Sequence, residues 1–200
     1  MRRDLVIISL LVAAIVLVPA LLYFGIFEKP IKASSDDVLI TQSDLPLGWI
    51  ESEYHYYDGE CEVSWATGIR FTNESISSGN DLYIFIVSWD SVNLARDDYL
   101  EKGGDPIFAE TYPLELGDDG VYWFGRTYMS DPNGTLLEGL EGNFSLESTT
   151  TCYLFREANI VVTIMFTTQW DGYGLKEPWM DDITHLQGEL VHQHNTAIWF

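Results

Sequence analysis

The chain has 200 residues, of which 46% are hydrophobic, and a formal net charge of −21 at pH 7. The first 35 residues carry a net charge of +2, so the rest of the chain carries −23. The apolar content excludes wholesale disorder. The acidic excess excludes binding to nucleic acid or anionic headgroups, both of which need a basic face. Cationic partners, metal ions or a salty medium remain compatible with it, and solubility alone is a sufficient explanation.

Residues 5–27 form an apolar run of 23 residues without a charge. As a helix this run would be about 35 Å long, and the hydrocarbon core of a bilayer is about 30 Å thick. A signal peptide has a shorter apolar region of roughly 7–15 residues and a small-x-small cleavage site. The following "FEKPIKASS" offers no good site close by. We therefore predict a cytoplasmic segment at 1–4 and an uncleaved membrane anchor at 5–27. A cleaved signal with an unusual site is the alternative.

The orientation of this anchor rests on several weak signals. Arg2 and Arg3 precede the run and Lys29 and Lys32 follow it, which slightly favours a cytoplasmic N-terminus. The even number of cysteines suits an oxidising compartment. Three Asn-x-Ser/Thr glycosylation acceptors point the same way, at Asn73, Asn133 and Asn143. We expect a single-pass protein of the cell membrane with its C-terminal part outside the cytoplasm.

After a linker at 28–36, residues 37–200 are expected to form one extracytoplasmic domain. Ser35 or Asp36 can cap a short helix through Gln42, which Pro46 must end. Strands are predicted at 49–57 and 63–72, and the Asp-Gly between them favours a hairpin. The almost wholly apolar "LYIFIVSW" at 82–89 predicts a central strand with both faces covered.

The second half continues with a helix at 91–104, stopped by Gly103. Strands are predicted at 106–116 and 121–129, then at 149–156 and 159–168 as a second hairpin around "EAN". A closing helix at 177–195 carries Pro178 in its first turn. Short antiparallel connections dominate this order. The predicted fold is therefore α+β, with one twisted, mainly antiparallel sheet and flanking helices.

Four segments resemble a known class when taken together: "SDLPLGW", "LYIFIVSWDSVNLARDDYL", "LGDDGVYW" and "FREANIVVTIMF". Their arrangement resembles PsbP-like extracytoplasmic lipoprotein and sensor ectodomains over roughly residues 37–195. The resemblance implies a curved antiparallel sheet with flanking helices and a binding or sensing role without catalysis. The chain departs from that class by a membrane helix in place of a lipid-bearing Cys, and by Ala158 where the hairpin often has Gly.

The two cysteines, Cys61 and Cys152, are the first candidate site. A disulfide between them would close a loop of about 90 residues and stabilise the fold by roughly 4–5 kcal/mol. Two free buried thiols are the alternative. No C-x-x-C or nearby His pair completes a zinc site.

The closing helix carries the only spacing that resembles a metal site. Asp181, His185, Glu189 and His192 share one helix face and are weak candidate ligands for a transition metal. The alternative is a solvated polar face, because an apolar stripe must point at the core and no second element completes the coordination. That stripe is Trp179, Ile183, Leu186 and Leu190.

Aromatic residues are abundant, and most are expected in the core. In "YHYY", Tyr54 and Tyr56 share one side of a strand, while His55 and Tyr57 share the other. Aromatic platforms beside carboxylates can also hold sugars. The expected exposed cluster is "WDGYG", whose glycines predict a loop. Its candidate ligand-contacting residues are Trp170, Asp171 and Tyr173.

The sequence contains no G-x-S-x-G, H-E-x-x-H, P-loop or G-x-G-x-x-G motif. We therefore expect a non-catalytic, membrane-anchored domain without a cofactor. It would bind or sense a small ligand or an envelope protein, or act as an accessory part of an envelope complex. A surface carbohydrate-binding or hydrolytic protein is the alternative, and a purely structural role stays open.

Overall fold

The computed structural model describes residue 15 and residues 30–59, 61–73, 80–103, 111–129, 146–169 and 178–195. Within them the chain folds as an α+β domain, as the sequence predicts. The elements in chain order are α2 (Ser35–Val38), the short 3-10 helix η1 (Gln42–Asp44), β1 (Trp49–Asp58), β2 (Val63–Asn73), β3 (Asn80–Trp89), α3 (Val92–Gly103), β4 (Thr111–Pro113), β5 (Asp119–Met129), β6 (Leu146–Glu157), β7 (Ile160–Gln169) and α4 (Pro178–Gln193).

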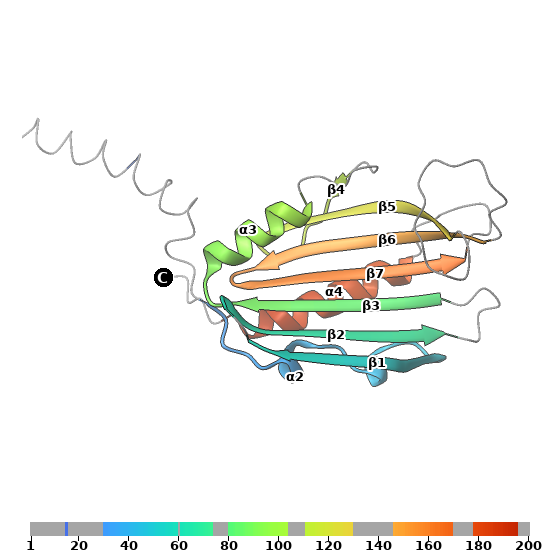
Figure 1. Ribbon diagram of the computed structural model, residues 1–200, viewed down its shortest axis with the longest axis horizontal. Coiled ribbons are helices and arrows are strands. Elements are labelled where there is room, and N and C mark those ends of the chain that lie inside the picture. The colour runs from blue at the N-terminus through green and yellow to red at the C-terminus, as the bar shows by residue number, and fades with distance from the viewer. Residues whose placement is uncertain are drawn as a thin grey trace, which may run out of the picture.

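The strands form one seven-stranded antiparallel sheet in the order β1-β2-β3-β7-β6-β5-β4 (Figure 1). Strand β7 joins the two halves of the sheet, because it pairs with β3 on one side and with β6 on the other. The edge strands are therefore β1 and β4. Of the strand predicted at 106–116, residues 106–110 lie outside the described residues and Thr111–Pro113 form β4. The predicted strand ends early at Pro113, because Leu114 and Leu116 leave the sheet and pack against the core.

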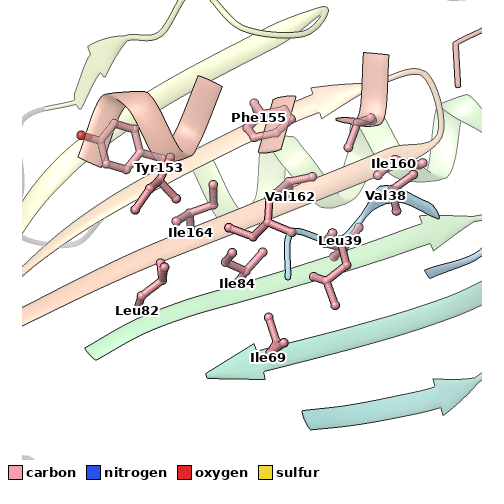
Figure 2. Packing of buried hydrophobic residues seen from close by; sticks show 14 of the residues in the cluster. Val38, Leu39, Ile69, Leu82, Ile84, Tyr153, Phe155, Ile160, Val162 and Ile164 are labelled. Atoms are coloured by element: carbon pink, nitrogen blue, oxygen red, sulfur yellow. The ribbon is translucent and has the colours of Figure 1, made fainter. Parts of the chain in front are cut away.

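The main core lies on the face of the sheet that α4 covers, called here the α4 face (Figure 1). Alternate residues of β3, β6 and β7 point to this face, as the period of a strand requires. Figure 2 shows Ile84, Ile164 and Tyr153 meeting there, with Val38 and Leu39 from the N-terminal segment above the same layer. Every one of these side chains is buried.

The opposite face, called here the α3 face, is covered by α3 over part of its area. Ala95 and Tyr99 of α3 pack on Leu154 of β6 and Val161 of β7. Gly103 lies so close to Leu154 that a β-carbon there would be 3.2 Å from its Cδ2 atom. The helix therefore covers the β6–β7 side of this face, at the end where these two strands turn.

Two buried amide side chains hold the N-terminal segment on the sheet. The Ile40 N–H donates to Gln187 Oε1 at 3.2 Å, and Gln187 Nε2 donates to the Val38 carbonyl. The Ile31 N–H donates to Asn159 Oδ1 at 2.5 Å.

Helix α2 ends at Val38, well before the predicted Gln42, because residues 39–40 extend into the core. The predicted linker at 28–36 is thus docked from Ile31 onward.

The predicted anchor at 5–27 lies outside the described residues except for Ile15. None of the helices that the structure describes combines the length and the apolar character needed to cross a bilayer. The anchor, its orientation and the short segment at 1–4 therefore stay predictions.

The β6–β7 hairpin contains a strained residue. Ala158 has a φ of 49°, in the left-handed region that costs a residue with a β-carbon roughly 1–2 kcal/mol. Its N–H donates to Asp118 at 2.7 Å and its carbonyl accepts from Arg156 at 2.8 Å, so the surroundings fix this conformation.

Replacing Ala158 with Gly is expected to stabilise the protein by about 0.5–1 kcal/mol, after the greater freedom of glycine in the unfolded chain is subtracted. The melting temperature followed by circular dichroism should rise by roughly 1–4 °C. Ala95→Gly is the control, because Ala95 is buried inside α3 and its replacement should destabilise. A loss of stability in Ala158→Gly would contradict the strain at this turn.

Candidate binding surface

Exposed apolar side chains gather along β1. Among the described residues, nine large hydrophobic side chains are exposed, and four of them are on this one strand: Ile50, Tyr54, Tyr56 and Tyr57. Leu47 lies just before the strand, and Phe85 lies two strands away on β3. Because exposed apolar side chains concentrate here, this strand is the candidate for an interaction surface.

Most described aromatic rings are buried or half-buried, as expected, and the three tyrosines of β1 are exceptions. Tyr54, Tyr56 and Tyr57 are 43%, 49% and 55% exposed. The cause is the position of β1 at the edge of the sheet, where neither the α4 layer nor α3 reaches most of the strand. Only Trp49, the first residue of β1, is buried, and its ring meets Trp179 at 5.6 Å between centroids.

The two edges of the sheet differ in how they are protected. In the part of the chain that the structure describes, strand β4 has three residues and ends in Pro113, and both features disfavour pairing with another chain. Strand β1 has ten residues, and among the described strands it pairs with β2 alone. Two features block pairing with another strand at the start of β1. The strand has a bulge between Glu51 and Glu53, and the Glu51 N–H already donates to Gln42 Oε1 at 3.5 Å. Residues 53–58 are therefore the unprotected part, called here the β1 edge.

The part of the α3 face next to the β1 edge is partly exposed to solvent. His55 of β1, Gly68 of β2 and Phe85 of β3 lie opposite one another in register. A β-carbon at Gly68 would be 3.2 Å from Phe85 Cδ2, so the phenyl ring lies over the glycine. The prediction that β3 is covered on both faces is thus wrong at Phe85, which is 36% exposed, although Val87 on the same face is buried. Helix α3 covers the β6–β7 side and the end of β3, where Trp89 Nε1 donates to Asp98 at 3.2 Å, and it leaves the face around Phe85 exposed.

A charged pair and an aromatic ring lie next to Phe85 on the same face. Arg70 of β2 donates to Asp81 of β3 at 3.0 Å, and its guanidinium carbon is 5.1 Å from the centre of the Tyr83 ring. The hydrogen bond to Asp81 raises the pKa of Arg70 despite partial burial. Arginine on tyrosine with a nearby carboxylate is therefore a contact that this sheet already makes within itself.

The β1 edge is acidic. Strand β1 carries Glu51, Glu53 and Asp58 and has no Lys or Arg. Glu53 and Asp58 are exposed, and His55 Nε2 lies 3.9 Å from Glu53 Oε2. Arg70 of the neighbouring strand lies opposite Glu53 in register, and its guanidinium is paired with Asp81. The edge therefore presents carboxylates and tyrosine rings side by side.

The predicted disulfide is wrong, because both cysteines are free and far apart. Cys152 of β6 is three strands away from β2 in the sheet order, which is about 14 Å. Cys61 lies in the turn before β2, displaced along the strands as well. A disulfide needs α-carbons within about 7 Å. The alternative of two free buried thiols is right about the free state and about the burial of Cys152, and wrong about Cys61, which is exposed.

The two thiols are expected to react very differently. Burial raises the pKa of Cys152 to about 12, so this thiol stays protonated at neutral pH, whereas Cys61 is exposed. The reactive species is the thiolate. An aromatic disulfide reagent should therefore titrate one thiol in the native protein and the second only after unfolding. A Cys61→Ser variant should show no rapid thiol, and rapid release of two equivalents would contradict the structure.

The weak metal candidates on α4 do not come together. Asp181 accepts from the Tyr153 hydroxyl at 3.0 Å, and His192 Nδ1 lies 2.6 Å from the buried Glu157 carboxylate. His185 and Glu189 are exposed. No three His, Cys, Asp or Glu side chains converge in the part of the chain that the structure describes. The predicted apolar stripe does pack against the core, with Ile183 buried and Trp179, Leu186 and Leu190 partly buried.

The remaining candidate residues are the glycosylation acceptors and the predicted ligand loop. Asn73 is the last residue of β2 and is 4% exposed, so the folded domain does not present this glycosylation acceptor. Asn133 and Asn143 lie outside the described residues, as do Trp170, Asp171 and Tyr173 of the predicted ligand loop.

The β1 edge was missed as a site by sequence reasoning, although a signal for it exists. Strand β1 has polar or charged residues at both of its alternating sets of positions, whereas β3 and β7 are apolar at most positions. A strand with no consistently apolar side is typical of a sheet edge. Arg70, Gly68 and Phe85 carry no comparable signal, because only the strand pairing brings them together.

No family model, curated protein or solved structure matches the chain. The resemblance to the PsbP-like class therefore stays an expectation.

Proposed function

We propose that the chain is a membrane-tethered, extracytoplasmic binding domain without a catalytic role, whose ligand surface is the β1 side of the sheet. The observation that carries this proposal is the concentration of exposed Ile50, Tyr54, Tyr56 and Tyr57 on one edge strand. A soluble domain stabilises itself by burying such side chains, so their exposure together indicates that a partner covers them.

The docking of the N-terminal segment supports the tethered part of the proposal. The predicted anchor ends at Phe27, and among the described residues that follow it the first buried one is Ile31, held by Asn159 at the turn of the β6–β7 hairpin. Four residue steps of chain reach at most about 14 Å. The hairpin end of the sheet would therefore face the bilayer closely. Asp58 lies in line with this end, because its register partners lead through Trp65 and Ser88 to Ile160, so the β1 edge extends from the bilayer end outward to Glu53.

The location is testable with the native Cys61. A membrane-impermeant maleimide added to intact cells is expected to label this exposed thiol as fully as it does after permeabilisation. A Cys61→Ser variant gives the background, since Cys152 is buried. Labelling that occurs only after permeabilisation would place the domain on the cytoplasmic side and overturn the tethered arrangement.

The binding role is testable with a photo-crosslinking amino acid placed at Tyr57 in the full chain in its native membrane. We expect a discrete adduct from this position and none from Leu100, an equally exposed apolar position on α3. A protein adduct supports the proposed role, and a glycan adduct supports the carbohydrate-binding alternative. The same background from both positions would remove the reason to assign binding to this surface.

A further inference from the structure

We propose that the β1 edge binds an extended, arginine-rich segment of a partner protein by adding it to the sheet as an eighth strand. This inference rests on the proposed function and names the class of its partner. It is carried by the asymmetry of the two sheet edges. Strand β4 is short and ends in Pro113, while residues 53–58 of β1 have neither a proline nor a pairing strand among the described residues.

The backbone of this edge provides the first part of the recognition. Alternate residues of an edge strand direct their N–H and C=O groups away from the sheet, where they can pair with an incoming strand. The six residues of the β1 edge span about 20 Å. The bulge and the Gln42 contact at Glu51 limit pairing to this stretch, so they also define where an added strand would begin.

The side chains of the edge provide the charge preference. Glu53 and Asp58 lie at the two ends of the β1 edge, and no Lys or Arg lies on β1. Tyr54, Tyr56 and Tyr57 are exposed between them. Carboxylates flanking tyrosine rings suit guanidinium groups, as the Arg70–Tyr83–Asp81 contact on the same sheet demonstrates.

The same charges argue against a second copy of this chain as the occupant. Two β1 edges pairing with each other would bring Glu53 and Asp58 of both copies together, and like charges across strands destabilise the pairing. A basic partner gains from these charges, whereas a neutral or acidic partner does not. The charge of −23 on residues 36–200 adds long-range attraction for such a partner.

The test uses the full chain in lipid nanodiscs and a labelled decapeptide that alternates arginine and threonine. Fluorescence anisotropy is expected to show binding, and hydrogen exchange should show protection of the backbone amides in residues 53–58. The same peptide with alternate residues N-methylated, which removes backbone donors but keeps every charge, should bind much more weakly. Equal binding of the two peptides would overturn strand addition.

A matched pair of charge variants tests the site. The variant Glu51→Lys/Glu53→Lys/Asp58→Lys is expected to weaken peptide binding at least about tenfold. The control Asp97→Lys/Glu101→Lys/Glu189→Lys makes the same change in net charge at exposed positions on α3 and α4 and should retain most of the affinity. Equal losses in both variants would show non-specific attraction and overturn the proposed site.

Different results would contradict the binding role of the domain and the addition of a basic strand. If the Tyr57 crosslink in native membranes survives the β1 charge reversal, the domain is a binding protein but its partner is not a basic strand. If both the crosslink and the peptide binding are absent, the proposed function fails together with this inference. Folding of each variant is checked by circular dichroism, which should be unchanged because every substituted side chain is exposed.

Discussion

Replacing Arg156 with Met is expected to lower the free energy of unfolding by about 3 kcal/mol and the melting temperature by roughly 6–12 °C. The Arg156 side chain is 2% exposed and lies 2.8 Å from Asp119 and 3.3 Å from Asp118. It also donates to the Ala158 carbonyl at 2.8 Å. Methionine keeps much of the side-chain volume. It leaves the Asp118 and Asp119 carboxylates without their cation and the buried Ala158 carbonyl without this hydrogen-bond donor. Denaturant unfolding of the full chain in detergent measures the loss.

The control for this prediction is Arg70→Met, which also breaks an Arg–Asp pair. The Arg70 and Asp81 side chains are 32% and 29% exposed, so water can replace part of their interaction. We expect a loss below about 1 kcal/mol. If Arg156→Met lowers the free energy of unfolding no more than Arg70→Met does, the buried charge cluster does not stabilise the packing of the β6–β7 hairpin on Asp118 and Asp119.

Replacing Gln187 with Leu is expected to destabilise the protein by about 2–4 kcal/mol. The Gln187 amide accepts from the Ile40 N–H and donates to the Val38 carbonyl, and Gln187 itself is fully buried. Leucine fills a similar space but leaves both backbone groups buried without a partner. The N-terminal segment should then detach first, which hydrogen exchange at residues 38–40 would detect together with the lower unfolding midpoint.

Gln193→Leu on the same helix is the matched control. Gln193 is exposed near the end of α4, so its replacement should change the stability by no more than about 0.5 kcal/mol. Comparable losses from the two variants would indicate a general effect on the helix. They would not support a specific role of Gln187 in holding residues 38–40.

The local structure of this domain follows closely from its sequence. The apolar runs at 82–89 and 159–168 became β3 and β7, and Pro178 begins α4 as its position predicts. Gly48 adopts a φ of 104° before the buried Trp49, which explains "DLPLGW" as a structural turn. These features depend on side-chain period, chain stiffness and turn chemistry, and such properties act between residues that are close along the chain.

The surroundings of the candidate surface could not be predicted in the same way. The sequence did not reveal that β7 inserts between β3 and β6, which leaves β1 at an edge. The tyrosines of "YHYY" read as core residues because aromatic side chains favour strands, but their exposure depends on what packs over the strand. The cysteines were expected to pair because their number is even, yet β3 and β7 lie between β6, which carries Cys152, and β2, which follows Cys61.

The sequence by itself determined the class of the fold, the number of strands, the closing helix and a strongly acidic surface. The tertiary structure decided the strand order, the free state of Cys61 and Cys152, and the unprotected β1 edge. The physical reason is that hydrophobic period and turn propensity act locally. Which strand ends at an edge depends instead on pairings between distant segments, whose energies no single stretch of sequence contains.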